Sequence, residues 1–383
     1  MDTASPINLS TATTSGQHPR ETFNEDDLKD LQEQLSLGFS RAQQQANNTS
    51  SRTYQIGPHK ICLNFANAAL EPYFTRALSH LDTSNHETPD LSVQIWDNAS
   101  NQSKLPLLLS SYIDLLRAQW WLHGDSRGEL IHFDGTAMRG AFFPYPNRLS
   151  VLDLQHNIAY YWIENATKLP YNVVGASLRV ILHWWFTQKN WQLVHAGAVG
   201  TAAGGMLIVG QGGSGKSTTC LSCLNSKLSY ASDDYSLVSL TPEPTVYSLY
   251  NTAKLKGQSD INRFPSLAPH IFNSENLETE KATLFVHEAN PHQIIREFPL
   301  KAILLPRIAG TPSTDFEPVS PGKALQSLSI STIFQLPGAH QGTLRFMSQL
   351  IRKVPTFRLN LGTDITQIPS VIEGILTQSQ GLD

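Results

Sequence analysis

A glycine-rich run at residues 210–217, GQGGSGKS, constrains this chain more than any other feature. It fits the phosphate-binding pattern G-x-x-x-x-G-K-[ST] at every fixed position. At ordinary glycine usage, a chance match somewhere in 383 residues has a probability on the order of one per cent. The pattern requires a strand before the loop and a helix after it. The apolar residues 206–209 and the breaker-free residues 218–224 predict both.

Each residue type in this glycine loop, residues 210–217, suits a separate task. Glycines let the backbone turn its N–H groups inward, toward phosphate oxygens at the positive end of the following helix. Lys216 would reach the β- and γ-phosphates, Ser217 stands where a hydroxyl ligates Mg²⁺, and Thr218 would hydrogen-bond a phosphate. The alternative is an ordinary glycine-rich turn. The predicted nucleotide-binding residues are Gly210, Gly212, Gly213, Ser214, Gly215, Lys216, Ser217 and Thr218.

Two adjacent carboxylates follow a predicted strand at residues 228–231. Asp233 and Asp234 would lie at the C-terminal end of that strand, where open sheets place ligand-binding groups. One carboxylate suits a Mg²⁺–nucleotide site, and the second could take the proton of an attacking hydroxyl. Neighbouring strand residues point to opposite faces, so both can serve only if the chain turns there. The alternative is a plain Asp-Asp turn between two strands.

A histidine stands upstream of the glycine loop. We expect residues 193–199 to form a strand that is hairpinned through residues 200–205 onto residues 206–209. This hairpin would bring His195 near the loop, where it could orient an acceptor or tune a carboxylate, because a histidine beside an aspartate titrates close to neutrality. A structural histidine in an apolar strand is the alternative.

The run His195-Ala-Gly-Ala-Val, the glycine hairpin, the glycine loop and Ser232-Asp233-Asp234 together resemble the catalytic domain of HPr kinase/phosphorylase. They resemble ATP-dependent phosphoenolpyruvate carboxykinase more loosely, and in layout they are most similar to the HPr-kinase-like serine kinases found beside peptide-maturation and siderophore enzymes in bacteria. The resemblance is specific over residues 192–240 and diffuse from there to the C-terminus. It implies an α/β fold with a P-loop HPr-kinase/PEP-carboxykinase-like catalytic domain.

The resemblance also implies roles for single residues. Lys216 and Ser217 would bind ATP and Mg²⁺, and Asp233 would be the base that acts on a serine hydroxyl. Asp234 would be the second metal ligand, and His195 a supporting residue. The implied partner is a hydroxyl-bearing acceptor, whether peptide, protein or small molecule. The order of roles within the aspartate pair stays open.

The chain departs from HPr kinase/phosphorylase downstream. That enzyme has an acidic-x-Arg-Gly-x-Gly run that serves metal and phosphorolysis, whereas residues 250–257 here carry Lys254 and Lys256. Two apart on a predicted strand, these lysines would face the same side, and would either meet a phosphate or an acidic acceptor or form a solvated pair. We therefore expect neither phosphorylase activity nor HPr as the substrate.

Composition bounds the partners and the compartment. A length of 383 residues with 40% hydrophobic and 16% charged residues is typical of a soluble two-domain protein. A net charge of −4 without a basic run argues against nucleic acid or an anionic membrane surface as the main partner. Three cysteines and no signal-peptide pattern fit the cytoplasm, and we interpret Cys220 and Cys223 as helix thiols. A homo-oligomer is compatible with the sequence.

Three segments are predicted along the chain. Residues 1–50 form a polar, partly disordered arm with a helix at 25–45, whose apolar stripe would dock on the protein body or on a partner. Residues 51–165 form a β-rich accessory domain, and residues 166–383 the catalytic domain. Strands are expected at 60–65, 91–96, 129–133, 148–153, 159–163, 300–307 and 356–361, and helices at 343–351 and 368–376.

An amphipathic helix is expected between the two domains. Val174, Leu178, Ile181 and Trp185 repeat at helical spacing and would pack on the catalytic sheet. The function predicted from the whole sequence is a kinase, and the alternative is a nucleotide-binding regulatory or assembly protein with little or no phosphoryl transfer. Carboxykinase-like transfer is disfavoured because those enzymes are considerably longer.

Overall fold

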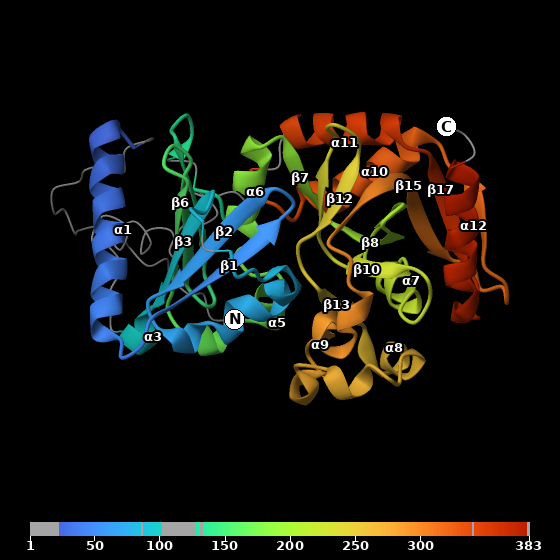
Figure 1. The fold of residues 1–383 in the computed structure, drawn as a ribbon, viewed down its shortest axis with the longest axis horizontal. Coiled ribbons are helices and arrows are strands. Elements are labelled where there is room, and N and C mark those ends of the chain that lie inside the picture. The colour runs from blue at the N-terminus through green and yellow to red at the C-terminus, as the bar shows by residue number, and fades with distance from the viewer. Residues whose placement is uncertain (1–22, 86, 102–126, 131–132, 339–340, 381–383) are drawn as a thin grey trace, which may run out of the picture.

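A computed structural model describes residues 23–85, 87–101, 127–130, 133–338 and 341–380 as a mixed α/β protein. The N-terminal half is built on a six-stranded sheet with the strand order β1-β2-β3-β6-β5-β4 (Figure 1). Strands β2, β3 and β6 run parallel, and the other pairs are antiparallel. The strands are β1 (Ser50–Ile56), β2 (His59–Phe65), β3 (Leu91–Asp97), β4 (Met138–Phe143), β5 (Arg148–Asp153) and β6 (Ile158–Ile163).

Helix α1 (Glu25–Gln45) covers one face of this sheet, as the prediction of a docked helix at 25–45 requires (Figure 1). Its N-terminus is closed by Asn24, whose side chain accepts from the first-turn amides while Asp27 reaches back to the Asn24 amide. Leu31 and Leu35 are fully buried against aromatic side chains of the sheet. The stripe therefore docks on the body of the protein.

The opposite face of the sheet packs against α2 (Pro72–Thr75), the 3-10 turn at Arg76–Leu81, α5 (Tyr171–Val174) and α6 (Arg179–Gln188). The prediction of one helix through this last region was wrong. Leu178 adopts a left-handed φ of 56°, which interrupts the helix. Within the break, the Gly175 carbonyl accepts a hydrogen bond from the Thr252 hydroxyl, and the Ser177 carbonyl accepts one from the Tyr250 hydroxyl. These neighbours satisfy the carbonyls without helical continuation.

The C-terminal half contains a nine-stranded sheet with the order β10-β8-β9-β15-β12-β11-β7, in which β17 pairs with β15 and with β16. The long strand β15 pairs antiparallel with β12 at its start and parallel with β9 and β17 further on. The strands are β7 (Trp191–Val194), β8 (Ala196–Thr201), β9 (Gly204–Val209), β10 (Ser229–Ser232), β11 (Ser236–Ser239), β12 (Thr245–Ser248), β15 (Glu297–Ile308), β16 (Asp315–Pro318) and β17 (Thr356–Leu361).

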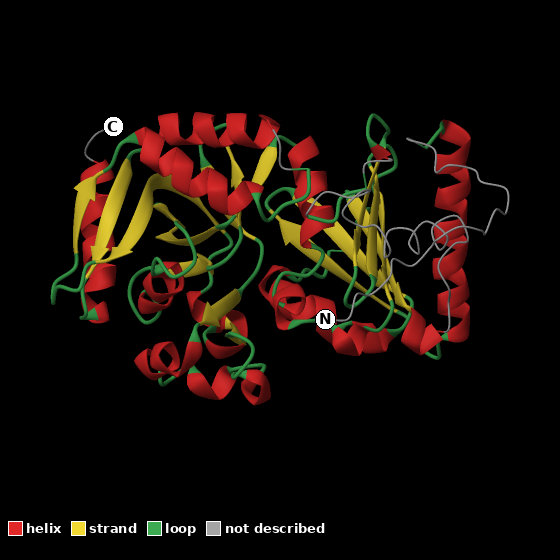
Figure 2. Ribbon diagram, turned by 180° about the vertical axis from the view of Figure 1, so that it is seen from behind, coloured by secondary structure: helices red, strands yellow, loops and turns green. Residues whose placement is uncertain are grey.

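Helices cover both faces of this second sheet (Figure 2). Helices α7 (Lys216–Ser222) and α12 (Ile368–Gln380) pack on one face, and α10 (Pro321–Ile333) and α11 (Gln341–Lys353) on the other. A separate two-stranded sheet joins β13 (Thr252–Leu255) to β14 (Ala282–Phe285), beside α8 (Gly257–Arg263) and α9 (Val286–Ala289). The remaining short helix is α3 (Asn98–Asn101).

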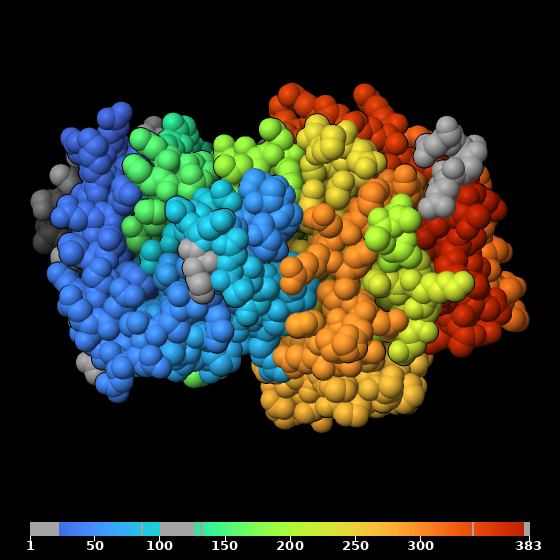
Figure 3. Space-filling view, viewed as in Figure 1, coloured from blue at the N-terminus to red at the C-terminus, as the bar shows by residue number. Residues whose placement is uncertain are grey.

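The two halves share a core. Buried residues of the first sheet, of α6 and of β7 and β11 belong to one apolar cluster, and the space-filling view shows the halves in broad contact (Figure 3). Helix α6 thus packs on both sheets and not on the second alone. At the surface of this junction, Arg76 donates to both oxygens of Glu288 at 2.8 and 2.7 Å. Whether the boundary near residue 166 separates two independent domains stays a prediction.

Most predicted strands and helices are present; apart from the helix that is broken at residues 175–178, the exception lies at residues 129–133. Of the described residues there, Glu129 makes only an isolated bridge to Ala141, and the Phe133 amide donates to the Leu130 carbonyl, which a continuous strand does not allow. The cysteine interpretation is confirmed, because Cys220 and Cys223 are buried free thiols on α7 and its C-cap. Within the described ranges, no helix has both the length and the apolar character that a bilayer span needs.

Candidate functional site

Strand directions bring three distant segments to one edge of the second sheet. Strands β9 and β10 both run antiparallel to β8, so their C-terminal ends lie at the edge where β8 begins. The glycine loop follows β9, the aspartate pair follows β10, and His195 immediately precedes β8. The predicted hairpin from β8 to β9 is present, with Gly200 paired to Gly205. This geometry explains why residues about forty positions apart in sequence meet here.

The glycine loop is open on one side and tightly packed on the other. A side chain at Gly212 or Gly213 would meet nothing within 4 Å. Gly215, by contrast, has a left-handed φ of 105°, and a Cβ there would lie 2.3 Å from Leu361 Cδ1. Helix α7 begins directly after it with no side-chain cap, so amides of its first turn lack partners inside the helix. The buried Ser214 hydroxyl has no hydrogen-bond partner in the described structure.

Lys216 folds across its own loop. Its Nζ donates to the carbonyls of Gly210 at 2.7 Å and Gln211 at 3.3 Å. Burial lowers the pKa of Lys216, although the charges of Asp233 and Asp234 oppose that effect. Ser217 and Thr218 are half-buried in the first turn of α7. The loop therefore brings together a cation, a hydroxyl and amides at the start of a helix, a set of groups suited to an anion.

The chain bends at Asp233 and Asp234, so both carboxylates turn toward the glycine loop and β13, as the sequence argument required. Asp234 has a partner on each oxygen: His195 Nε2 lies 2.9 Å from Oδ1 and Lys254 Nζ 2.5 Å from Oδ2. Burial alone would raise the pKa of Asp234, but the Lys254 cation and the His195 hydrogen bond outweigh it and hold that pKa well below its usual value. Asp234 is thus ionised.

The pKa of Asp233 is shifted in the opposite direction. Its side chain is 2% exposed, and burial together with the charge of Asp234 raises its pKa to about 6. Its Oδ2 accepts from the Lys254 amide at 3.0 Å. Its buried Oδ1 accepts no hydrogen bond of regular geometry from the described residues, although the Ser217 hydroxyl is close enough to lower the pKa. Asp233 therefore lies beside the Ser217 hydroxyl, and its Oδ1 is available to a ligand.

His195 is fixed in one tautomer by its neighbours. Gln335 Nε2 lies 3.3 Å from His195 Nδ1, and because an amide nitrogen only donates, Nδ1 accepts and Nε2 carries the proton that it donates to Asp234. Burial lowers the pKa of His195 more than Asp234 raises it, so the ring is neutral at pH 7. The His195 amide also donates to Thr332 Oγ1 at 3.1 Å.

The structure separates the two downstream lysines and adds residues that the sequence did not indicate. Lys254 lies on β13 and reaches Asp234, whereas Lys256 is exposed beyond the end of that strand, so strand periodicity does not apply to the pair. Thr332 lies in the last turn of α10 and Gln335 just beyond it, more than 130 residues after His195. No local pattern marks them, because their role depends only on tertiary packing.

The oxygen groups at this site fit a magnesium ion. The Ser217 hydroxyl and the unbonded Asp233 oxygen lie together beside the open loop. In the described ranges, no group of three or more His, Cys, Asp or Glu side chains forms a dedicated metal cage. Mg²⁺ commonly binds through one or two carboxylates, with phosphate oxygens and water as its other ligands.

Comparisons with known proteins give little beyond this geometry. No protein-family model matches the chain, and no curated protein matches it. Among solved structures, the HPr(Ser) kinase/phosphatase from Coxiella burnetii aligns with 10% identity, covering 50% of this chain and 97% of that chain, with a TM-score of 0.27. A similarity at this level carries no conclusion about family or activity. The chemistry of the site therefore has to be argued from its own residues.

Proposed function

We propose that this protein is an ATP- and Mg²⁺-dependent kinase that transfers the γ-phosphate to a hydroxyl, most plausibly a serine hydroxyl of a peptide, a protein or a small molecule. The supporting observation is the meeting of Lys216, Ser217 and two carboxylates with oppositely shifted pKa values at one sheet edge. An isolated glycine-rich turn has no need of such a pair. The acidic pair is what distinguishes a transfer site from a phosphate-binding loop alone.

In this proposal, the glycine loop binds the nucleotide. Amides of residues 212–217 and the Lys216 ammonium hold the β- and γ-phosphates, after Lys216 exchanges its carbonyl partners for phosphate oxygens. Ser217 and Asp233 hold Mg²⁺, because the loop hydroxyl lies beside the unbonded oxygen of Asp233. The metal, when bound, neutralises charge on the phosphates. This assignment moves the metal from Asp234, which the family resemblance implied, to Asp233.

In this proposal, Asp234 is the base that takes the proton of the acceptor hydroxyl. The acceptor oxygen forms a bond to the γ-phosphorus, the bond from phosphorus to the β,γ-bridging oxygen breaks, and the hydroxyl proton passes to Asp234. Lys254 and His195 keep this carboxylate ionised and oriented. The low pKa of Asp234 makes it a weak base, but phosphoryl transfer depends mainly on positioning and on stabilisation of charge. His195 is a positioning residue in this scheme.

The test is acceptor-dependent transfer from labelled ATP in the presence of Mg²⁺, with serine-containing peptides and free serine as acceptors. We expect transfer in the wild type, and none in Lys216→Ala because phosphate binding is lost. Asp234→Asn should bind ATP normally and fail to transfer, whereas Asp233→Asn should require more Mg²⁺. The control is Asp260→Asn, an aspartate that bonds to the Lys256 amide at the start of α8.

The outcomes separate the candidate functions. ATP binding without acceptor-dependent transfer under any condition would overturn the kinase proposal and favour a regulatory nucleotide-binding protein. Transfer that survives in Asp234→Asn but disappears in Asp233→Asn at saturating Mg²⁺ would return the base to Asp233. Equal activity in Lys216→Ala and the wild type would exclude the glycine loop as the nucleotide site.

A further inference from the structure

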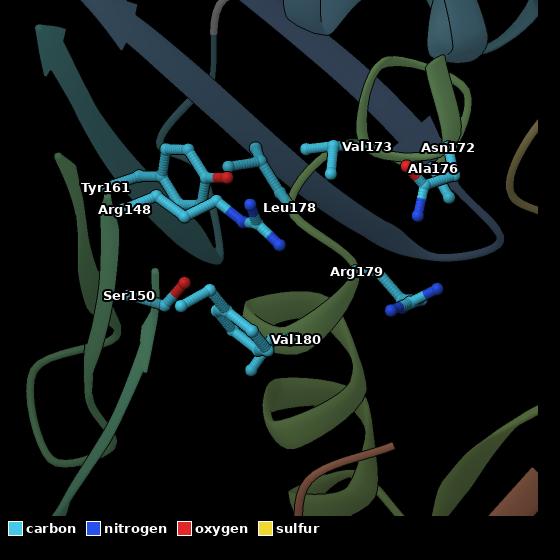
Figure 4. A pocket seen from close by; sticks show the side chains of 10 residues that line it. Arg148, Ser150, Tyr161, Asn172, Val173, Ala176, Leu178, Arg179 and Val180 are labelled. Carbon is cyan, nitrogen blue, oxygen red and sulfur yellow. The ribbon is translucent and has the colours of Figure 1, made fainter. Parts of the chain in front are cut away.

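A polar cavity lies away from the glycine loop, where the first sheet meets α5 and α6 (Figure 4). This arginine pocket has a volume of about 40 Å³ and is open to solvent at its mouth. Arg148, Ser150 and Tyr161 come from β5 and β6, and Asn172 and Arg179 from α5 and α6. Among the described residues, its lining contains two arginines and no acidic side chain.

Arg148 is a half-buried cation that makes no ion pair with the described residues. Its guanidinium stacks 4.7 Å from the centre of the Phe143 ring, and its Nη1 is buried without a hydrogen-bond partner in the described structure. Burial lowers the pKa of Arg148, and the nearby charge of Arg179 lowers it further. A desolvated charge that lacks a partner is costly. Packing on Phe143 alone does not offset that cost.

The guanidinium of Arg179 has hydrogen-bond partners for only some of its N–H groups. Its Nη1 donates to the Tyr235 hydroxyl at 2.5 Å, whereas its buried Nε has no hydrogen-bond partner among the described residues. Arg179 opens the ten-residue helix α6, whose N-terminus has no side-chain cap. Figure 4 shows Arg148 reaching from the strands toward the start of α6, with Arg179 leaving that first turn on the side of Asn172. Arg148 and Arg179 thus line one cavity, beside the uncapped start of α6.

We propose that the arginine pocket binds a carboxylate or phosphate anion held by Arg148 and Arg179. Guanidinium groups match both anions with paired N–H donors, and binding would satisfy the two buried nitrogens that lack partners. The hydroxyls of Ser150 and Tyr161 lie on the same wall of the pocket, and the exposed Asn172 stands at its mouth. No residue of this pocket belongs to the nucleotide site.

Hydrogen bonds connect the pocket to the acidic pair. Arg179 donates to Tyr235, and Tyr235 donates to Gln335 at 2.5 Å. Gln335 in turn donates to His195, which holds Asp234. The anion has two sources with the same chemistry: an acid group of the phosphoryl acceptor, or a separate anionic effector. Anion binding itself rests on the cavity and does not depend on the kinase proposal.

The first experiment measures binding by calorimetry, with inorganic phosphate and with succinate as separate probes. It uses Lys216→Ala as the background, so that phosphate bound at the glycine loop is reduced. We expect Arg148→Met to weaken both probes roughly tenfold or more, and Arg148→Lys to weaken them less. The control is Arg263→Met, which removes an exposed arginine paired with Asp260 on α8.

Two results would overturn the proposal: no binding of either probe at millimolar concentration in the Lys216→Ala background, or equal binding with and without Arg148. Thermal unfolding shows that each variant is folded.

The second experiment uses the transfer assay to find the source of the anion. If the anion is the acceptor's own acid group, Arg148→Met raises the KM for the acceptor and not the KM for ATP, and phosphate competes with the acceptor. If the anion is a separate effector, Arg148→Met leaves the KM for the acceptor unchanged and abolishes the effect of phosphate on transfer.

Discussion

The Lys254 ammonium lies 2.5 Å from Asp234 Oδ2, while the Lys254 amide lies 3.0 Å from Asp233 Oδ2. One residue of β13 therefore contacts both members of the aspartate pair. Its cation holds the pKa of Asp234 down, whereas its amide is too weak a partner to offset the burial that raises the pKa of Asp233. Two adjacent carboxylates thus differ in pKa, which lets them perform different tasks.

Lys254→Met should separate transfer from binding. Without the cation, Asp234 loses the partner that keeps it ionised and oriented, so we expect phosphoryl transfer to fall by about a hundredfold or more. ATP affinity should change little, because Lys254 is not part of the glycine loop. Lys256→Met is the matched control, since Lys256 is exposed two residues further on. Equal losses in the two variants would show that the Asp234 contact is irrelevant.

The raised pKa of Asp233 predicts that this aspartate destabilises the folded protein at neutral pH. Its pKa is about 6 in the fold and near 4 in an unfolded chain, so ionisation above pH 6 costs about 2 to 3 kcal/mol. Asp233→Asn removes that cost. Its unfolding free energy in metal-free buffer should exceed that of the wild type above pH 6, and the gap should close as pH falls toward 4. A gap that is the same at pH 4 and pH 8 would contradict this cause.

Two glycines of the loop should respond differently to alanine. Gly215→Ala forces a side chain into a left-handed φ and against Leu361, so we expect a loss of stability of about 1 to 3 kcal/mol together with loss of nucleotide binding. Gly212→Ala points into open space and should leave the melting temperature unchanged, while a methyl group on the open side weakens ATP binding. The prediction fails if thermal unfolding does not distinguish the two variants.

Local patterns predicted the parts of the site that depend on neighbouring residues. The β8–β9 hairpin and the helix after the loop follow from glycine placement and apolar runs within about forty residues. The bend at Asp233 entered the sequence argument only as a condition for both carboxylates to serve, and the structure meets that condition. The α6 break did not follow from periodicity. The apolar repeat continues through residues 175–178, but Thr252 and Tyr250 take the carbonyls there, and those residues lie seventy positions away.

Long-range pairing is also the reason that other site residues were missed. Gln335 acts on His195 only because α10 packs beside the start of β8, and a lone glutamine carries no sequence signal for that contact. The arginine pocket was missed for the same reason. Arg148 and Arg179 belong to a strand and a helix about thirty residues apart, and only the fold shows that they line one cavity whose described residues include no carboxylate.

Helix α1 gives a test of the fold outside the site. Leu35 is fully buried against the first sheet, whereas Leu37, two residues along the same helix, is 45% exposed. Leu35→Ala should therefore lower the free energy of unfolding by about 2 to 4 kcal/mol through lost burial and a residual cavity. Leu37→Ala makes the same chemical change at a partly solvated position and should stay within about 0.5 kcal/mol of the wild type. Denaturant unfolding of both variants measures the difference, and similar values would mean that α1 does not pack on the sheet in solution.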